Sequence, residues 1–156
     1  MARKRANPHI NIPPQSVKVE VTAAGDPIEY SAVIKSFGAT KKKKKRRVAG
    51  HADPIKLPKD SGPYRITFKL VTRLDLRFDA AGPLLCDVTY GDACPNSLNR
   101  VQFMVESCTD DELVVVDWNF GVGAEFHYQL NFTTSVGVPQ KAFDPIIVNG
   151  GGIKRV

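Results

Sequence analysis

Apolar side chains recur at every second residue over long stretches of this chain, and that period limits what the chain can fold into. Residues 64–78, YRITFKLVTRLDLRF, keep a single phase of alternation throughout. Residues 126–133, FHYQLNFT, alternate aromatic or aliphatic residues with polar ones in the same way. Because successive side chains of an extended strand point to opposite faces, this period predicts strands with one buried face.

Further β-rich segments are separated by turn residues such as Gly, Pro, Asn and Asp, and no window carries the period of an amphipathic helix. These segments cover residues 16–22, 28–35, 84–90, 100–106, 113–118 and 143–149. About seven to nine short strands with regular turns are typical of an all-β, two-sheet antiparallel sandwich, with a partly open barrel as the structural alternative. Trp118 and the aromatic residues of 126–132 are expected in the core.

The length of 156 residues fits one domain with one core. We expect a flexible basic arm at residues 1–15 and a single sandwich domain at residues 16–150. Residues 37–63 hold no sustained apolar repeat of either period, so they are expected to form a long basic surface loop within that domain. Residues 151–156 are expected to form a flexible tail.

Three cysteines, Cys86, Cys94 and Cys108, are an odd number in a chain long enough to build a core without disulfides. We therefore expect free thiols in a reducing compartment. The basic amino terminus runs into Asn, His and Pro, where a secretory signal needs an apolar stretch. The sequence thus favours a cytoplasmic location. It also predicts no membrane insertion, because no segment approaches the roughly 18–20 apolar residues that span a bilayer.

The net charge of +6 comes from two short segments. Outside them, 12 basic residues stand against 16 acidic ones, so the body of the chain is mildly acidic. The candidate polyanion-binding residues are Arg3, Lys4, Arg5, Lys41, Lys42, Lys43, Lys44, Lys45, Arg46 and Arg47. Adjacent like charges repel and favour an extended, solvated segment that phosphates can neutralise.

If all seven residues of the run contacted duplex DNA, the logarithm of the binding constant would fall with the logarithm of the salt concentration with a slope of about −6. Such binding would show no sequence preference. No aromatic residue lies between Lys41 and Arg47 to stack on single-stranded bases. A purely solubilising loop explains the run equally well. Attraction to an anionic membrane surface ranks third, because neither an amphipathic helix nor a lipidation signal accompanies the run.

No pattern in the sequence indicates catalysis, a metal site or a cofactor. The cysteines sit eight and fourteen positions apart without a CxxC pair, so a zinc site formed by them with His127 is disfavoured. His127 is expected to be an outward-facing polar residue of its strand, and Asp110 with Asp111 to form a solvated turn. We expect no catalytic residues, no metal ligands and no cofactor.

Three segments resemble the small bacterial immunoglobulin-like domains of the DP-EP family, whose role is unknown. They are the opening VKVEVT strand, the late FHYQLNF strand, and the ending Asp144-Pro145-Ile146-Ile147-Val148-Asn149-Gly150. The resemblance covers mainly residues 16–36 and 64–150 and implies an immunoglobulin-like sandwich. It implies a fold and no chemistry. The lysine-rich segment within 37–63 departs from the family pattern.

The sequence favours a non-enzymatic β-sandwich module that acts through protein contacts or self-association, because sandwiches offer edge strands and no chemical constellation is present. The alternative is non-specific nucleic-acid binding through the basic arm and the Lys41–Arg47 loop. An enzyme is the third class, since a cleft assembled from distant residues leaves no linear pattern.

Overall fold

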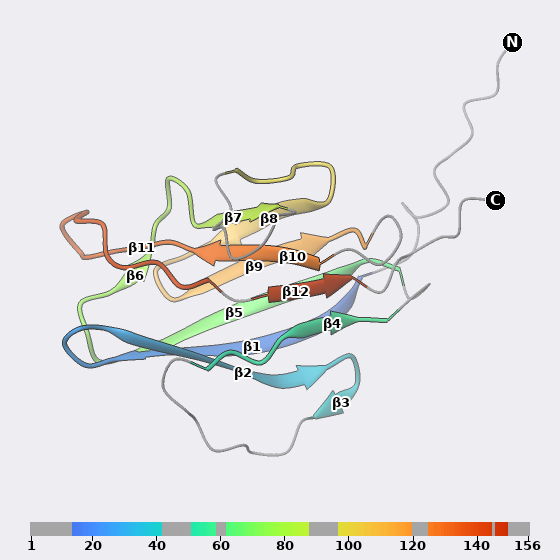
Figure 1. The fold of residues 1–156 in the computed structure, drawn as a ribbon, viewed down its shortest axis with the longest axis horizontal. Coiled ribbons are helices and arrows are strands. Elements are labelled where there is room, and N and C mark those ends of the chain that lie inside the picture. Colours follow the sequence, from blue (N-terminus) through green and yellow to red (C-terminus); the bar gives the residue numbers. More distant parts are fainter. Residues whose placement is uncertain are drawn as a thin grey trace, which may run out of the picture.

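The computed structural model describes residues 14–41, 51–58, 62–87, 97–119, 125–144 and 146–149. These residues form twelve strands and no helix, so the all-β prediction is confirmed (Figure 1). The six-stranded sheet has the order β3 (Thr40–Lys41), β2 (Glu29–Phe37), β1 (Gln15–Ala24), β5 (Tyr64–Thr72), β9 (Glu112–Asp117) and β8 (Phe103–Cys108). The four-stranded sheet has the order β4 (Ile55–Leu57), β12 (Ile146–Asn149), β10 (Glu125–Leu130) and β7 (Leu84–Asp87). A small third sheet pairs β11 (Phe132–Thr133) with β6 (Arg77–Phe78).

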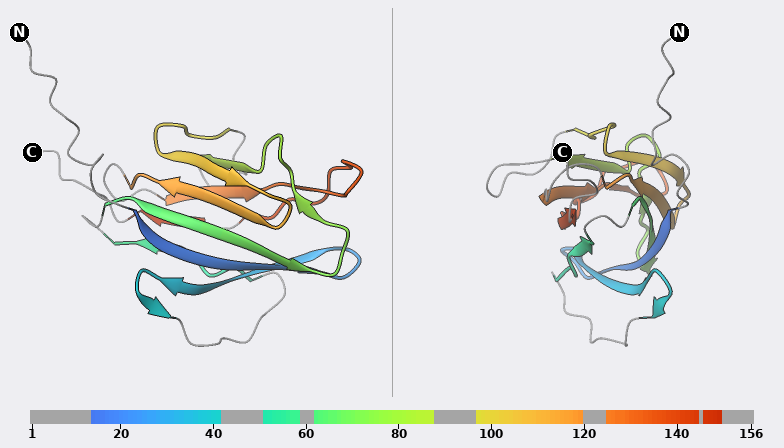
Figure 2. Two further views of the ribbon diagram at one scale, coloured as in Figure 1. Left: turned by 180° about the vertical axis from the view of Figure 1, so that it is seen from behind. Right: turned by 90° about the vertical axis from the view of Figure 1, so that its right-hand side faces the viewer.

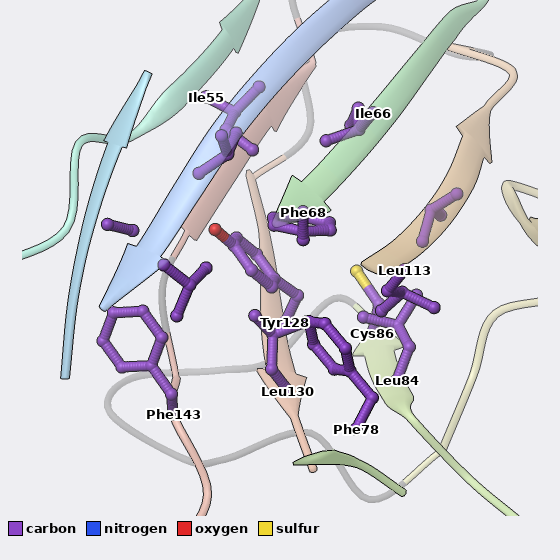
Figure 3. Close-up of a cluster of buried hydrophobic side chains, with 14 of the residues drawn as sticks. Ile55, Ile66, Phe68, Phe78, Leu84, Cys86, Leu113, Tyr128, Leu130 and Phe143 are labelled. Carbon is purple, nitrogen blue, oxygen red and sulfur yellow. The ribbon is translucent and has the colours of Figure 1, made fainter. Parts of the chain in front are cut away.

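The core lies between the two larger sheets, and the six-stranded sheet curves around one side of the four-stranded one (Figure 2). The alternation seen in the sequence produces this core directly. Along β1 and β5 every second side chain is buried, while the intervening polar residues face solvent. From the opposite sheet Tyr128 packs its ring against Phe68, with ring centroids 5.4 Å apart (Figure 3).

Two strand pairs are parallel, which corrects the prediction of a wholly antiparallel sandwich. β1 runs parallel to β5 over nine residue pairs, and β12 runs parallel to β4 over three. Both pairs join strands that are far apart in the chain, so no tight hairpin fixes their direction. Side-chain alternation indicates which face of a strand is buried and carries no information on the direction of its partner.

Residues 37–63 are not one surface loop, because they contain β3 and β4. Ile55 is 0% exposed and Leu57 is 2% exposed, so both belong to the core. The chain before them pairs with β2 through Ala32, whose amide donates to the His51 carbonyl at 3.0 Å. Residues 51–57 therefore cross from the six-stranded sheet to the four-stranded one. We call this edge, formed by residues 51–57 with β2 and β12, the sealed seam.

A buried carboxylate fastens the sealed seam. Asp53, 9% exposed, accepts a hydrogen bond from the Ile34 amide at 3.2 Å, and its own amide donates to the Ala32 carbonyl at 2.9 Å. His51 Nε2 lies 3.5 Å from an oxygen of the same carboxylate. The backbone and the Asp53 side chain of this short crossing thus both have partners on β2.

The two longest alternating runs are each broken into two strands. The run 64–78 divides after Thr72 and resumes at Arg77 as β6. The run 126–133 divides at Asn131, whose amide donates to the Pro83 carbonyl at 3.0 Å in register with the β10–β7 pairing, while Pro83 has no amide hydrogen to donate in return. These breaks and the short β3 and β4 raise the strand number above the seven to nine expected.

Candidate docking groove at the open seam

The edge opposite the sealed seam is where β7 and β8, the outer strands of the two large sheets, face each other. Among the described residues no pairing joins β7 to β8 themselves, but residues 97–99, just before β8, bridge to β7: the Cys86 amide donates to the Ser97 carbonyl at 2.9 Å, and the Asn99 amide donates to the Cys86 carbonyl at 2.8 Å. We call this edge the open seam. It holds a groove of about 720 Å³. The lining residues are Ala81, Gly82, Pro83, Leu84, Leu85, Ser97, Leu98, Arg100, Phe103, Met104, Val105 and Trp118.

The groove has an apolar floor and an apolar rim. Phe103 and Leu84 are buried at its base as members of the core. Met104, on the outer side of β8, is 42% exposed, and the neighbouring Val101 is 77% exposed. Solvent-exposed apolar side chains that gather next to a concave apolar surface are typical of a docking site.

Trp118 is half-buried and lines this groove, so the prediction that it belongs to the core is wrong. The preceding residue, Asp117, occupies the interior-facing position at the end of β9 and is 0% exposed. Because side chains alternate, Trp118 is directed outward, toward the side that Val116 and Met104 occupy. A tryptophan side chain favours burial, but the position of Trp118 directly after the inward-facing Asp117 directs it outward.

A buried polar network holds this end of the groove in place. One Asp117 oxygen accepts hydrogen bonds from Gln102 Nε2 at 3.0 Å and from the Asn119 amide at 2.8 Å. Asn119 has a positive φ of 53°, a conformation that asparagine tolerates better than most residues. Its side-chain amide donates to the Gly62 carbonyl at 3.2 Å. The Trp118 backbone is thereby fixed on both sides, which pre-forms the groove rim.

β8 is an edge strand with a defect in its second half. A β-bulge interrupts its register with β9 between Val105 and Ser107. The bulged residue, Glu106, accepts two hydrogen bonds from Arg65, at 2.6 and 2.8 Å, on the outer face of the sheet. The hydrogen bond from Arg65 lowers the pKa of Glu106 below its ordinary value. The straight part of the edge is therefore limited to Phe103–Val105.

The far end of β8 is acidic. Cys108 ends the strand half-buried, and its thiol pKa is raised by burial and then by the negative charges of Asp79 and Asp110. A raised pKa leaves the thiol protonated and weakly nucleophilic at neutral pH. Nothing at this end therefore resembles a reactive cysteine, and its notable property is a negative electrostatic environment.

Most of the sequence-predicted site residues fall outside the described residues. Arg3–Arg5 and Lys42–Arg47 do so, while Lys41 ends β3 with an exposed side chain. Polyanion binding by this set stays a prediction. Cys86 is buried in the core, and Cys94 lies outside the described residues.

Within the described ranges, no three His, Cys, Asp or Glu side chains lie close enough together to hold a metal ion. His127 is half-buried on β10, opposite Asp87 and Ile146 of the flanking strands. One feature of the sequence indicates the groove, although the alternating pattern does not reveal it. Phe103 and Met104 are adjacent apolar residues, so one of the two must face outward in any strand.

The part of the chain that the structure describes contains no helix of the length and apolar character needed to cross a membrane. No protein-family model matches this sequence, and no curated protein matches it.

Proposed function

We propose that this domain is a non-enzymatic protein-interaction module that binds an extended apolar segment of a partner in the groove of the open seam. The single observation that carries the proposal is the apolar rim that Met104 and Trp118 form beside an edge strand. Edge strands and apolar grooves are the two features that peptide-binding domains use most often. An extended segment satisfies both, because it offers alternate side chains to the groove and a backbone to the edge.

The energetics favour contact with an apolar partner. Burying a methionine or a valine side chain contributes roughly 1.5–3 kcal/mol relative to leaving it exposed. The groove rim is fixed in advance by the Gln102, Asp117 and Asn119 network, so little conformational entropy is lost on binding. Arg100 lies exposed on the rim, where an acidic residue flanking the apolar segment of a partner would find a counter-charge.

The finer fold assignment belongs to the same proposal. The two-layer arrangement with an aromatic core supports an immunoglobulin-like module of the kind that the DP-EP resemblance implies. The parallel β1–β5 pair in the middle of the larger sheet is the feature that departs most from that class.

Panning a random peptide library against the chain at low concentration tests the function. The selected peptides should alternate apolar and polar residues and should shift the fluorescence of Trp118, the only tryptophan in the chain. Met104→Asp should weaken their binding by roughly ten-fold or more, because it places an unpaired charge in the apolar rim.

The matched control is Val71→Asp. Val71 on β5 is 42% exposed, the same fraction as Met104, and it lies outside the groove lining. This variant should bind the selected peptides within about two-fold of the native chain, a difference smaller than 0.5 kcal/mol. Equal weakening by both substitutions, or a library that yields no groove-binding peptide, contradicts the proposed function.

A further inference from the structure

Among the described residues no strand pairs with the outer edge of β8 at Phe103–Val105, and the chain carries a segment of matching pattern ahead of its first strand. We propose that residues 3–12 of one copy of this chain bind along β8 in the groove of a second copy. This inference rests on the proposed function, because it names the occupant of the same groove. Three independent features support it: the apolar spacing, the charge and the reach of the segment.

The spacing of apolar residues fits the floor of the groove. Ile10 and Ile12 are separated by one polar residue, and Phe103 and Val105 of β8 have the same separation. Residues directly opposite each other in an antiparallel pair share one face. With Ile12 opposite Phe103 and Ile10 opposite Val105, both isoleucines point between the two sheets, where the groove is lined by Leu84 and Leu85 of β7.

The same register brings opposite charges together. Arg5 precedes Ile12 by seven residues, and Asp110 follows Phe103 by seven. Seven extended residues span roughly 23 Å, and the bulge at Glu106 shortens the path along β8 by about one residue, so Arg5 falls within side-chain reach of Asp110 in the turn after β8. Asp110 is 73% exposed and available to a second cation beside Arg77, which lies 3.4 Å away. The basic and apolar parts of the segment thus match the acidic and apolar parts of the edge.

The length of chain between the segment and β1 decides whether the segment can bind the groove of its own chain or only that of a second copy. Gln15 at the start of β1 is in register with Tyr64, then Asp117, then Phe103, which is three strand spacings away. A strand added beyond β8 lies a fourth spacing away, about 19 Å along the sheet. Ile12 is three residues from Gln15, and three residues span at most about 11 Å. A chain therefore cannot place Ile12 in its own groove, whereas the segment of a neighbouring copy has no such limit.

Sedimentation velocity over a range of concentrations tests the association on the full chain. We expect concentration-dependent self-association, accompanied by a shift of Trp118 emission to shorter wavelength. Ile10→Ser with Ile12→Ser should raise the dissociation constant roughly ten-fold or more. Arg5→Glu should raise it several-fold at low salt and less at high salt. Lys18→Glu is the matched charge control, because Lys18 is exposed on β1 and lies outside the groove lining.

Cross-linking tests the register. A chain with Arg5→Cys mixed with a chain that carries Asp110→Cys, treated with a short bismaleimide, should form a covalent dimer that neither variant forms alone, because Asp110 is exposed just beyond the end of β8. A strict monomer overturns the inference, as does equal association of the native chain and the double isoleucine variant. If library peptides still bind the groove in that case, the proposed function stands without the inference. If neither peptides nor a second copy bind, both fail.

Discussion

The two long edges of this sandwich differ in how far they are covered. The sealed seam contributes to the stability of the fold, whereas the open seam offers a surface for binding. At the sealed seam, residues 51–57 pass from one sheet to the other, fill the interior with Ile55 and Leu57, and fasten β2 through Asp53. At the open seam, β7 and β8 meet without strand pairing among the described residues and leave apolar side chains exposed. A sandwich needs apolar filling at both edges; the sealed seam has two fully buried side chains there, whereas at the open seam Leu98, which bridges to β7, is only partly buried.

The largest expected effect contrasts the two seams directly. Ile55→Ala at the sealed seam should reduce the free energy of unfolding by about 2–5 kcal/mol, because it removes a fully buried side chain and leaves a cavity. Met104→Ala at the open seam should change it by no more than about 0.5 kcal/mol, because that side chain is 42% exposed. Urea unfolding of both variants measures the difference. Similar losses at the two seams would contradict the comparison.

An alkaline titration of the Tyr30 hydroxyl on β2 tests how well solvent is excluded near the sealed seam. The Tyr30 hydroxyl donates to the Lys141 carbonyl, and its ring stacks on Phe132 and Phe143 with centroids 5.1 and 5.2 Å away. Burial raises the pKa of Tyr30 from 10.0 to about 12. Since the folded pKa lies above the unfolded one, the stabilisation is complete below pH 10 and is lost as pH rises through about 12.

The measurement is the ultraviolet absorbance of tyrosinate as pH is raised, with unfolding followed in parallel. Tyr30→Phe should remove one transition near pH 12 and lower the free energy of unfolding at neutral pH by roughly 1 kcal/mol, the contribution of one hydrogen bond. A Tyr30 transition close to pH 10 would show that solvent enters this side of the domain.

The smallest expected effect concerns the open seam, where Glu106 and Arg65 tie β8 to the outer face of its sheet. Glu106→Gln should reduce the free energy of unfolding by only about 0.2–1 kcal/mol at neutral pH, because both side chains are exposed and screened by salt. The pKa of Glu106 is lowered in the folded chain, so its stabilisation is present above the unfolded pKa and lost as pH falls through the folded value. The free energies of unfolding of the native chain and the variant should therefore become equal in acid. Urea unfolding at neutral pH and in acid measures this. A larger loss that persists in acid argues for packing of the side chain instead.

Sequence reasoning succeeded where burial on one face repeats over many residues. β1, β5 and β10 follow the alternation closely, because each has one face on the core and one in solvent. It failed at β4, since three residues are too few to establish a period and β4 is held in the core by pairing with β12, which is distant in the sequence. The parallel pairing of β1 with β5 is equally non-local and left no trace in either segment.

The groove was missed for a related reason. Trp118 was assigned to the core by its side-chain type, whereas its exposure is decided by alternation with Asp117. The pattern of residues 100–106 predicts a strand that contains Met104, and only the topology shows that β8 lies at an edge with β7 opposite. A docking surface made from the rims of two sheets is a property of their arrangement, and no single segment encodes it.

The bulge at Glu106 also opposes the stacking of copies of this domain along the edge of β8. A long, straight, uncovered strand edge invites copies to stack without limit into fibrils, whose regular backbone ladder tolerates no extra residue in one strand. The irregularity between Val105 and Ser107 interrupts that ladder after three residues, and the carboxylate there adds a charge. Stacking of copies along this edge is thereby opposed by the same irregularity that leaves Phe103–Val105 without a second strand partner among the described residues.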